Sequence, residues 1–186
     1  MFQSIIQKIR ILKNVEGYIN VRKELCNKLL IISLLIITCS LTNEAYASNS
    51  IGEKASEFTV MTVGGEQIKL SNYKGKVMVL NFWTTWCTYC QEEMQELIDF
   101  TNEVKSLDIN VVAINVTNTE RSKKAVEQFV NSTEIPFEIG LDEDGEITKD
   151  YRVIGIPTTF IIDKGGRVKR IFYGPITKEI LMKEIK

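Results

Sequence analysis

The sequence predicts an α/β domain with a mixed β-sheet, parallel in its first part and antiparallel in its last, flanked by helices. Two observations support this fold class. Between residues 77 and 132, continuous apolar runs alternate with segments whose apolar residues recur at helical spacing. Between residues 158 and 174, two strand-like runs are joined by a short turn, which predicts an antiparallel pair at the end of the sheet.

The first part of the domain contains four readable segments. FTVMTVGGEQIKL (58–70) has two β-rich runs on either side of a Gly-Gly pair, which predicts an N-terminal β-hairpin extension. The polar stretch before it, SNSIGEKASE (48–57), is interpreted as a joint. VMVLNFW (77–83) is continuously apolar, as is typical of a strand buried on both faces. A helix is predicted from Thr88 to about Ser106, where the apolar spacing changes to three and four.

The second part continues the alternation. NVVAINV (110–116) predicts another buried strand, and RSKKAVEQFVNS (121–132) predicts a helix that ends before Pro136. The charged run from Glu120 to Lys124 is interpreted as a solvated surface at the start of that helix. The remaining predicted elements are a short strand in PFEIGLD (136–142), a short helix in GEITKDYRV (145–153), the hairpin at 158–174 and a C-terminal amphipathic helix N-capped by Thr177.

An apolar run, LLIISLLIITCSL (29–41), precedes the domain. It is shorter than the roughly 20 residues that span a bilayer, but it fits the apolar region of a secretory signal. Lys23 and Lys28 lie before it, and Ala45-Tyr46-Ala47 follows with the small-x-small pattern of a signal peptidase site. The run therefore predicts export of the chain.

We expect a leader at 1–47, cleaved after Ala47, and a single domain at 48–186. Two other fates of the leader stay open: retention as a membrane anchor, which would keep the N-terminal segment in contact with the membrane, and lipidation at Cys39. A start at Val21 is also open, because the residues after it read as an ordinary positively charged signal start. Every version places the domain outside the cytoplasm, where disulfides persist.

The composition excludes some kinds of site. Lys plus Arg (23) nearly balances Asp plus Glu (24), so we expect no nucleic-acid partner. The chain has no histidine, which excludes a Cys-His nucleophile pair, His-ligated haem and zinc sites that need histidine.

Two of the four cysteines, Cys87 and Cys90, form a CxxC motif in FWTTWCTYCQEE. A structural zinc site would need two further ligands, and the other two cysteines lie in the leader, so we expect no metal. A purely structural disulfide across two residues would stabilise the fold very little, because it closes a very short loop. A redox-active pair explains the motif better.

The predicted helix begins at or just after Cys87. Unpaired N–H groups and the helix dipole at this position favour a thiolate. We expect Cys87 to be the exposed nucleophile that attacks a partner's disulfide. Cys90 is then the inner thiol that resolves the mixed disulfide.

The strand, WTTWCTYC and a helix, followed some seventy residues later by GIPTTF (155–160), resemble the thioredoxin superfamily. The leader and LSNYKGKVMVLNFWTTWCTYCQEEM resemble its ResA/TlpA-like branch of extracytoplasmic thiol-disulfide oxidoreductases. The resemblance covers about residues 55–180 and implies a thioredoxin-like fold. It also implies that the Cys87–Cys90 disulfide is the only redox group, without a further cofactor.

The resemblance implies further site residues. Pro157 matches the family's cis-proline, which lies against the disulfide and leaves the backbone of Ile156 free to pair with an extended substrate. Trp86 matches the tryptophan beside the nucleophile, although core packing is an alternative role. Thr88 and Tyr89, between the cysteines, are expected to tune the reduction potential.

Glu93 is the candidate proton carrier. It lies three residues after Cys90 and four before Leu97, so helical spacing places it on the same inward face, where desolvation raises a carboxyl pKa. Cytoplasmic thioredoxins carry a buried aspartate where this chain has Asn81, whereas ResA-like proteins have a glutamate at the position of Glu93. The alternative is a partly exposed helix glutamate, as expected for the neighbouring Gln91 and Glu92.

The function that these features favour is reduction of disulfides in secreted or membrane-facing proteins. By resemblance, the candidate substrates are apocytochrome c or a cell-envelope maturation enzyme, and the candidate electron donor is a membrane thiol carrier. Three alternatives remain: a disulfide-forming oxidase, a non-catalytic binding module on the same scaffold, and a peroxidase.

Overall fold

The computed structural model describes residues 23–24, 27–29, 32–33 and 49–185. The described residues before position 45 are helical and exposed. Within the described residues, no helix is both long and apolar enough to cross a membrane. The predicted cleavage site at Ala47, Cys39 and the alternative start at Val21 lie outside these residues, so the leader remains a prediction.

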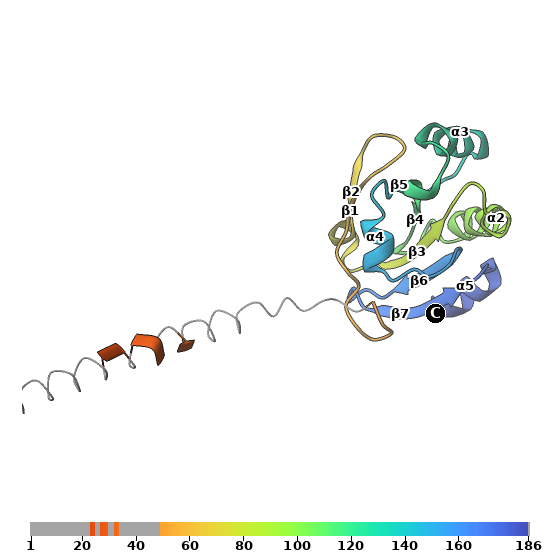
Figure 1. Cartoon of the computed structure of the whole chain (residues 1–186). Coiled ribbons are helices and arrows are strands. Elements are labelled where there is room, and N and C mark those ends of the chain that lie inside the picture. Colours follow the sequence, from red (N-terminus) through yellow and green to blue (C-terminus); the bar gives the residue numbers. More distant parts are fainter. Residues whose placement is uncertain (1–22, 25–26, 30–31, 34–48, 186) are drawn as a thin grey trace, which may run out of the picture. The chain divides into compact units, whose positions relative to one another are not determined.

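The domain is built on a five-stranded sheet of order β5-β4-β3-β6-β7 (Figure 1). Its strands are β3 (Val77–Trp83), β4 (Ile109–Asn115), β5 (Glu138–Leu141), β6 (Thr158–Ile162) and β7 (Val168–Tyr173). β3 pairs parallel with β4, and β4 parallel with β5. β6 pairs antiparallel with β3 and with β7. These pairings confirm the predicted mixed sheet. The apolar runs at 77–83 and 110–116 correspond to its buried central strands β3 and β4.

The helices are α2 (Thr88–Glu103), α3 (Lys123–Thr133), α4 (Glu146–Asp150) and α5 (Lys178–Glu184), with short 3-10 segments η1 (Leu70–Tyr73) and η2 (Thr117–Thr119). Side chains cap three of them: Cys87 caps α2, Ser122 caps α3 and Thr177 caps α5 as predicted. Each cap satisfies a backbone N–H that a helix start otherwise leaves unpaired.

Alternating residues of the central strands divide the core into two faces. On one face, Leu80 and Phe82 of β3 pack with the N-terminal hairpin and with Tyr151 just after α4. On the other face, Val79 packs with α2 and α5, and Trp83 packs with α2 and α3. The domain therefore has three layers, with α2, α3 and α5 on one side of the sheet and the hairpin and α4 on the other (Figure 1). This arrangement is the thioredoxin-like fold that the sequence motifs imply.

The N-terminal hairpin consists of β1 (Thr59–Met61) and β2 (Gln67–Lys69), which pair antiparallel as predicted. Just beyond β1, the N–H of Val63 donates to the carbonyl oxygen of Ile139 at 3.0 Å. The hairpin thus covers the outer edge of β5.

The stretch 48–57 is more than the polar joint that the sequence predicts. The N–H of Gly52 donates to the carbonyl oxygen of Val168 at 2.8 Å, and the N–H of Val168 donates to the carbonyl oxygen of Glu53 at 2.9 Å. This segment therefore covers the start of the outer edge of β7, at Val168. The periodicity of 48–57 could not predict this, because its partners lie at the other end of the domain.

Asn49 anchors the start of that segment. Its side chain is buried and donates to Ser56 Oγ and to the carbonyl oxygen of Asp150, each at 2.7 Å, while its Oδ1 accepts from the N–H of Ser56 at 2.7 Å. Its φ of 46° is left-handed, a conformation that Asn adopts more readily than most residues.

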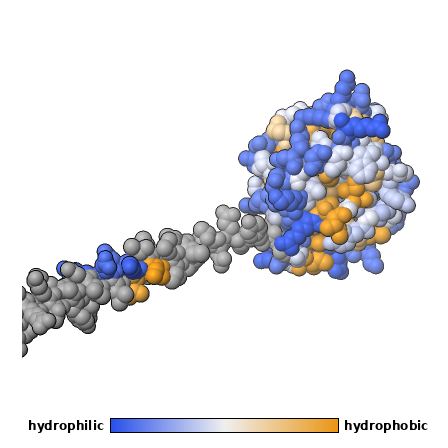
Figure 2. Space-filling model, viewed as in Figure 1, coloured by the Kyte–Doolittle hydropathy of each residue, from blue (hydrophilic) through white to orange (hydrophobic). Residues whose placement is uncertain are grey.

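On the face shown in Figure 2, the surface of the domain is mostly hydrophilic, with a patch of apolar side chains.

Candidate active site

The CxxC motif lies where β3 gives way to α2. Cys87 is the N-cap of α2, and its Sγ accepts a hydrogen bond from the N–H of Cys90 at 3.2 Å. The two cysteines form a disulfide, with Cα atoms 5.2 Å apart. One N–H of the first turn of α2 thus points at the Cys87 sulfur, and this position at the start of a helix favours a thiolate when the disulfide is reduced.

The loop before β6 lies against the disulfide. The Ile156–Pro157 peptide bond is cis, as the motif implies, and Pro157 is buried. The Sγ of Cys87 is 4.0 Å from the carbonyl oxygen of Ile156. Ile156 as a residue is half-buried. The structure therefore brings together Cys87 and the loop that were predicted to meet a substrate. Cys87 is only 7% exposed, however, so the predicted exposure of the nucleophile is wrong for the disulfide form, because the residue packs between the start of α2 and the loop at Ile156.

Three other predicted residues border the disulfide. Trp86 is 57% exposed and Tyr89 is 63% exposed, and Thr88 is exposed as well. The exposure of Trp86 excludes its alternative role in core packing. Its indole Nε1 donates to the carbonyl oxygen of Thr119 at 3.2 Å, which leaves the ring at the surface beside Cys87. The redox-tuning role of Thr88 and Tyr89 stays a prediction.

Glu93 is buried beneath the motif, with 2% of its surface exposed. Its carboxylate accepts three hydrogen bonds: Oε2 from Asn81 Nδ2 at 3.0 Å, and Oε1 from Thr159 Oγ1 at 3.3 Å and from the N–H of Ile176 at 3.2 Å. These donors come from β3, β6 and the residues before α5. The predicted inward position of Glu93 is confirmed, and the alternative of a partly exposed glutamate is wrong.

Burial raises the pKa of Glu93 from 4.5 to about 7. The three hydrogen bonds favour the charged form and lower the pKa, but the loss of water outweighs them. A carboxyl group that titrates near neutral pH can both accept and release a proton under ordinary conditions. Glu93 therefore has the properties of a proton carrier, and its role in the reaction remains a prediction.

Asn81 occupies the strand position next to Glu93. It is fully buried and directly opposite Thr159 in the β3–β6 pair, and its Nδ2 also donates to Thr159 Oγ1 at 2.9 Å. Its Oδ1 is buried and has no hydrogen-bond partner within residues 49–185. One acceptor beside Glu93 is therefore unfilled.

The prediction of a solvated surface is wrong for one residue near the motif. Glu120 is half-buried, and its carboxylate accepts hydrogen bonds from Thr85 and Asn115. Gln91 is exposed as predicted, and its Nε2 donates to the carbonyl oxygen of Thr85 at 2.6 Å. No local pattern could have identified the contact between Glu120 and Thr85, which lies 35 residues earlier in the chain.

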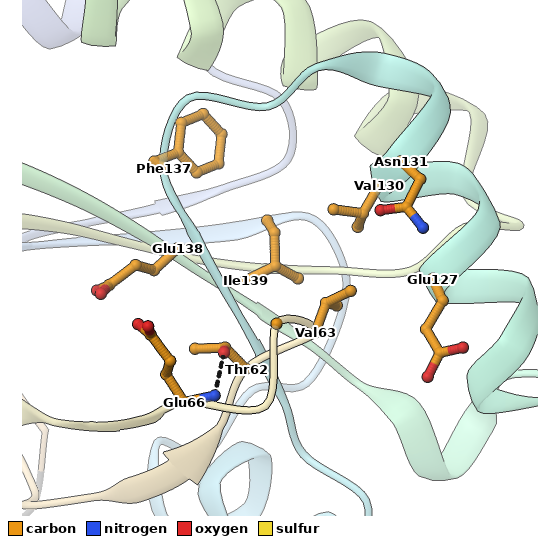
Figure 3. Close-up of a pocket in the computed structure, with 10 residues that line it drawn as sticks. Thr62, Val63, Glu66, Glu127, Val130, Asn131, Phe137, Glu138 and Ile139 are labelled. Carbon is orange, nitrogen blue, oxygen red and sulfur yellow. Dashed lines mark hydrogen bonds between the residues drawn. The ribbon is translucent and has the colours of Figure 1, made fainter.

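A surface pocket of about 530 Å³ lies elsewhere, between the loop of the N-terminal hairpin, α3 and β5 (Figure 3). Its lining includes Val63, Val130 and Phe137 and the carboxylates of Glu66 and Glu127, but none of the predicted site residues. Among the described residues, no three His, Cys, Asp or Glu side chains are grouped so that they could hold a metal ion.

Residues 51–171 match the AhpC/TSA family. The chain is 38% identical over 136 residues to the thiol-disulfide oxidoreductase ResA of Bacillus thuringiensis, and the match covers 73% of this chain and 77% of that protein. The crystal structure of StoA from Bacillus subtilis is similar, with a TM-score of 0.65 and 34% identity over 70% of this chain and 97% of that chain. An exposed lipoprotein thioredoxin from Streptococcus pneumoniae gives a TM-score of 0.63 and 26% identity over 70% of this chain and 98% of that chain.

Proposed function

Since this chain belongs to the AhpC/TSA family and is a thiol-disulfide oxidoreductase of the ResA type, we propose that it reduces disulfide bonds of partner proteins outside the cytoplasm. The observation that carries the proposal is the disulfide at the start of α2, with a buried carboxyl group, Glu93, on the inner side of the same helix. The first group exchanges electrons and the second exchanges protons.

The reaction begins from the reduced enzyme. The thiolate of Cys87 attacks one sulfur of the partner's disulfide, so that a mixed disulfide forms and the partner's other cysteine leaves as a thiolate. Exposed Trp86 and half-buried Ile156 border the attacking sulfur and are the proposed substrate contacts, Ile156 through its backbone. The buried Pro157 follows Ile156 in the same loop and is a further proposed contact.

The second step releases the partner. The thiol of Cys90 gives its proton to the carboxylate of Glu93, and the resulting thiolate attacks the sulfur of Cys87. The partner cysteine that was bonded to Cys87 leaves as a thiolate, and the Cys87–Cys90 disulfide forms. Two electrons have then passed from the enzyme to the partner. Glu93 afterwards releases its proton, and a membrane thiol donor returns two electrons to the enzyme.

The location outside the cytoplasm is supported by the apolar leader and by the similarity to an exposed lipoprotein thioredoxin. Secreted or membrane-facing proteins are the proposed partners, with apocytochrome c and cell-envelope maturation enzymes as candidates. Retention of the leader would add membrane contact through the N-terminal segment.

Trapping tests this proposal. The Cys90→Ser variant lacks the resolving thiol, so it should accumulate a partner as a mixed disulfide at Cys87. The Cys87→Ser variant is the matched control and should capture nothing. Retention of activity by Cys87→Ser, or capture of cytoplasmic proteins alone, would be incompatible with the proposal.

The reduction potential determines the direction of electron flow. A value near or below about −270 mV, as in thioredoxin, fits a reductase. A value near about −120 mV would instead identify a disulfide-forming oxidase with the same chemistry. Equilibration of the purified protein with glutathione or dithiothreitol buffers measures it.

A further inference from the structure

The turn between β3 and α2 is held by the segment that follows β4. Glu120 accepts hydrogen bonds from both polar groups of Thr85: Oε1 from the backbone N–H at 2.6 Å and Oε2 from the hydroxyl at 2.6 Å. The indole of Trp86 donates to the carbonyl oxygen of Thr119 at 3.2 Å. Three hydrogen-bond donors of the turn before Cys87 therefore donate to two adjacent residues, Thr119 and Glu120.

The carboxylate of Glu120 is itself fixed from the sheet. Asn115, the last residue of β4, is fully buried, and its Nδ2 donates to Glu120 Oε1 at 2.9 Å. Its Oδ1 accepts from Thr117 Oγ1 at 2.9 Å, which fixes the orientation of the amide. We call Glu120, Asn115 and Thr85 the Glu120 clamp. It connects the end of a buried strand to the turn before Cys87.

The turn needs such outside support. Its residues, Thr84, Thr85 and Trp86, include no Gly, Pro, Asn or Asp, which are the residues that usually specify tight turns. Glu120 accepts from both polar groups of Thr85, so it fixes the position and the orientation of that residue at once. The half-buried Glu120 therefore provides much of the constraint on this turn.

We propose that Glu120 is a positioning residue for disulfide exchange: through Thr85 it fixes Cys87 and Trp86 relative to the loop at Ile156. Cys87 lies two residues after Thr85, so a shift of the turn moves the sulfur away from the substrate path. Displacement of a reacting group by about 1 Å can lower a rate by about a hundredfold. The inference rests on the proposed role of Cys87 as the attacking thiol.

Three variants of the full-length chain separate position from charge. Glu120→Ala removes both oxygen acceptors. Glu120→Gln removes the charge but keeps the shape: its Oε1 can accept from the N–H of Thr85, and its Nε2 can donate to the hydroxyl. Glu92→Ala is the matched control, because Glu92 is an exposed carboxylate on α2 near the same motif.

Two rates are measured for each reduced protein. The first is the rate of insulin disulfide reduction, which needs Cys87, Trp86 and the loop at Ile156 correctly placed relative to one another. The second is the rate at which iodoacetamide alkylates Cys87 between pH 5 and 9, which needs only an accessible thiolate. We expect Glu120→Ala to reduce insulin about tenfold more slowly, with alkylation changed by less than about threefold at pH 7. Glu120→Gln should recover most of the insulin rate, and Glu92→Ala should match the unmodified protein.

Several outcomes would contradict the proposal. An insulin rate within twofold of the unmodified protein in Glu120→Ala would do so, as would an equal loss of both rates with a lowered thermal midpoint, which indicates loss of the fold. Failure of Glu120→Gln to recover the rate would show that the charge matters rather than the position. If Glu120→Ala does not fold, Thr85→Val removes one donor while keeping the side-chain shape, and it should slow insulin reduction in the same sense. Activity retained by Cys87→Ser would overturn the proposed function itself, whatever Glu120 does.

Discussion

Asn81 and Glu93 are joined by a hydrogen bond of 3.0 Å, and the same Asn81 amide keeps its oxygen buried without a partner in the described domain. The ionised Glu93 needs donors, and Asn81 Nδ2 is one of them. The protonated Glu93 needs an acceptor for its O–H, and Asn81 Oδ1 becomes that acceptor if the amide rotates by half a turn. An aspartate at this position would offer no such donor.

Replacement of Glu93 by glutamine should slow the resolution of the mixed disulfide. The amide cannot take the proton that Cys90 loses, and general base catalysis typically contributes about a hundredfold or more. Stopped-flow measurement of mixed-disulfide decay between pH 5 and 9 should show this loss, together with loss of the inflection near pH 7 that the pKa of Glu93 produces. Glu92→Gln is the control, and an unchanged pH–rate profile in Glu93→Gln would exclude the proton-carrier role.

The stability of the oxidised protein should fall as pH rises from about 4.5 to about 7. The native state keeps a proton on Glu93 across this window because burial raises its pKa to about 7, whereas the unfolded chain releases the proton at about 4.5. The unfolded state thus binds fewer protons, and the unfolding free energy decreases with pH by up to roughly 3 kcal/mol. Urea unfolding at several pH values should show this decrease in the unmodified protein and not in Glu93→Gln. A constant difference between the two proteins at all pH values would refute the assignment.

Changes at Asn81 should move the titration of Glu93. Asn81→Leu removes a donor to the ionised carboxylate, so the pKa of Glu93 should rise above the value in the unmodified protein. Asn81→Asp places a second carboxyl group there, and the pair should titrate in two steps, one of them displaced upward by repulsion between like charges. Infrared bands of the carboxyl groups, recorded across the pH range, measure both changes. Thr159→Val should have a smaller effect than Asn81→Leu, because the bond to Glu93 that it removes is the longer one, at 3.3 Å.

Gly140→Ala should destabilise the domain by about 1–3 kcal/mol through overpacking. A Cβ at Gly140 would lie 2.6 Å from Val60 Cγ1 and 2.9 Å from Ile114 Cδ1. Gly155→Ala is the control, since no atom lies within 4 Å of the Cβ that it would add. Chemical denaturation measures the change, and the double variant with Val60→Ala should regain part of the stability. If the Gly140 and Gly155 variants are equally stable, the close approach of the hairpin to β5 is wrong.

Asn49→Ala should loosen the start of the domain. It removes three hydrogen bonds and leaves the carbonyl oxygen of Asp150 without this donor, a loss of about 1–3 kcal/mol. Amide hydrogen exchange should accelerate at Gly52 and Ala55, whose N–H groups donate to the carbonyl oxygens of Val168 and Gly166. The rate of disulfide exchange should stay the same. Asn49→Gly also lacks the side-chain hydrogen bonds but adopts the left-handed backbone conformation without strain, so comparison with Asn49→Ala separates these two contributions to stability. Slow exchange retained at Gly52 in the Ala variant would show that Asn49 is not the anchor.

The sequence identified the parts of the site that local pattern determines. An apolar run specified β3, the change of period specified the start of α2, and spacing along one helix placed Cys90 and Glu93 on the same face. Glu120 was misread because a glutamate before a charged helix start looks solvated whenever its partners are unknown. Its partners are the turn after β3 and the last residue of β4, and only the pairing of those strands brings them together. The same reason explains why the stretch at 48–57 appeared featureless.

The coverage of both sheet edges by one N-terminal stretch has a consequence for biosynthesis. Residues 52–55 leave the ribosome early, but they pair with Gly166 and Val168, which leave it among the last. Contacts between such distant parts of a chain form slowly. Residues 52–55 thus stay without their partner strand until nearly the whole polypeptide has been synthesised, and during that interval their unpaired backbone groups are a target for aggregation and for chaperones that bind extended segments.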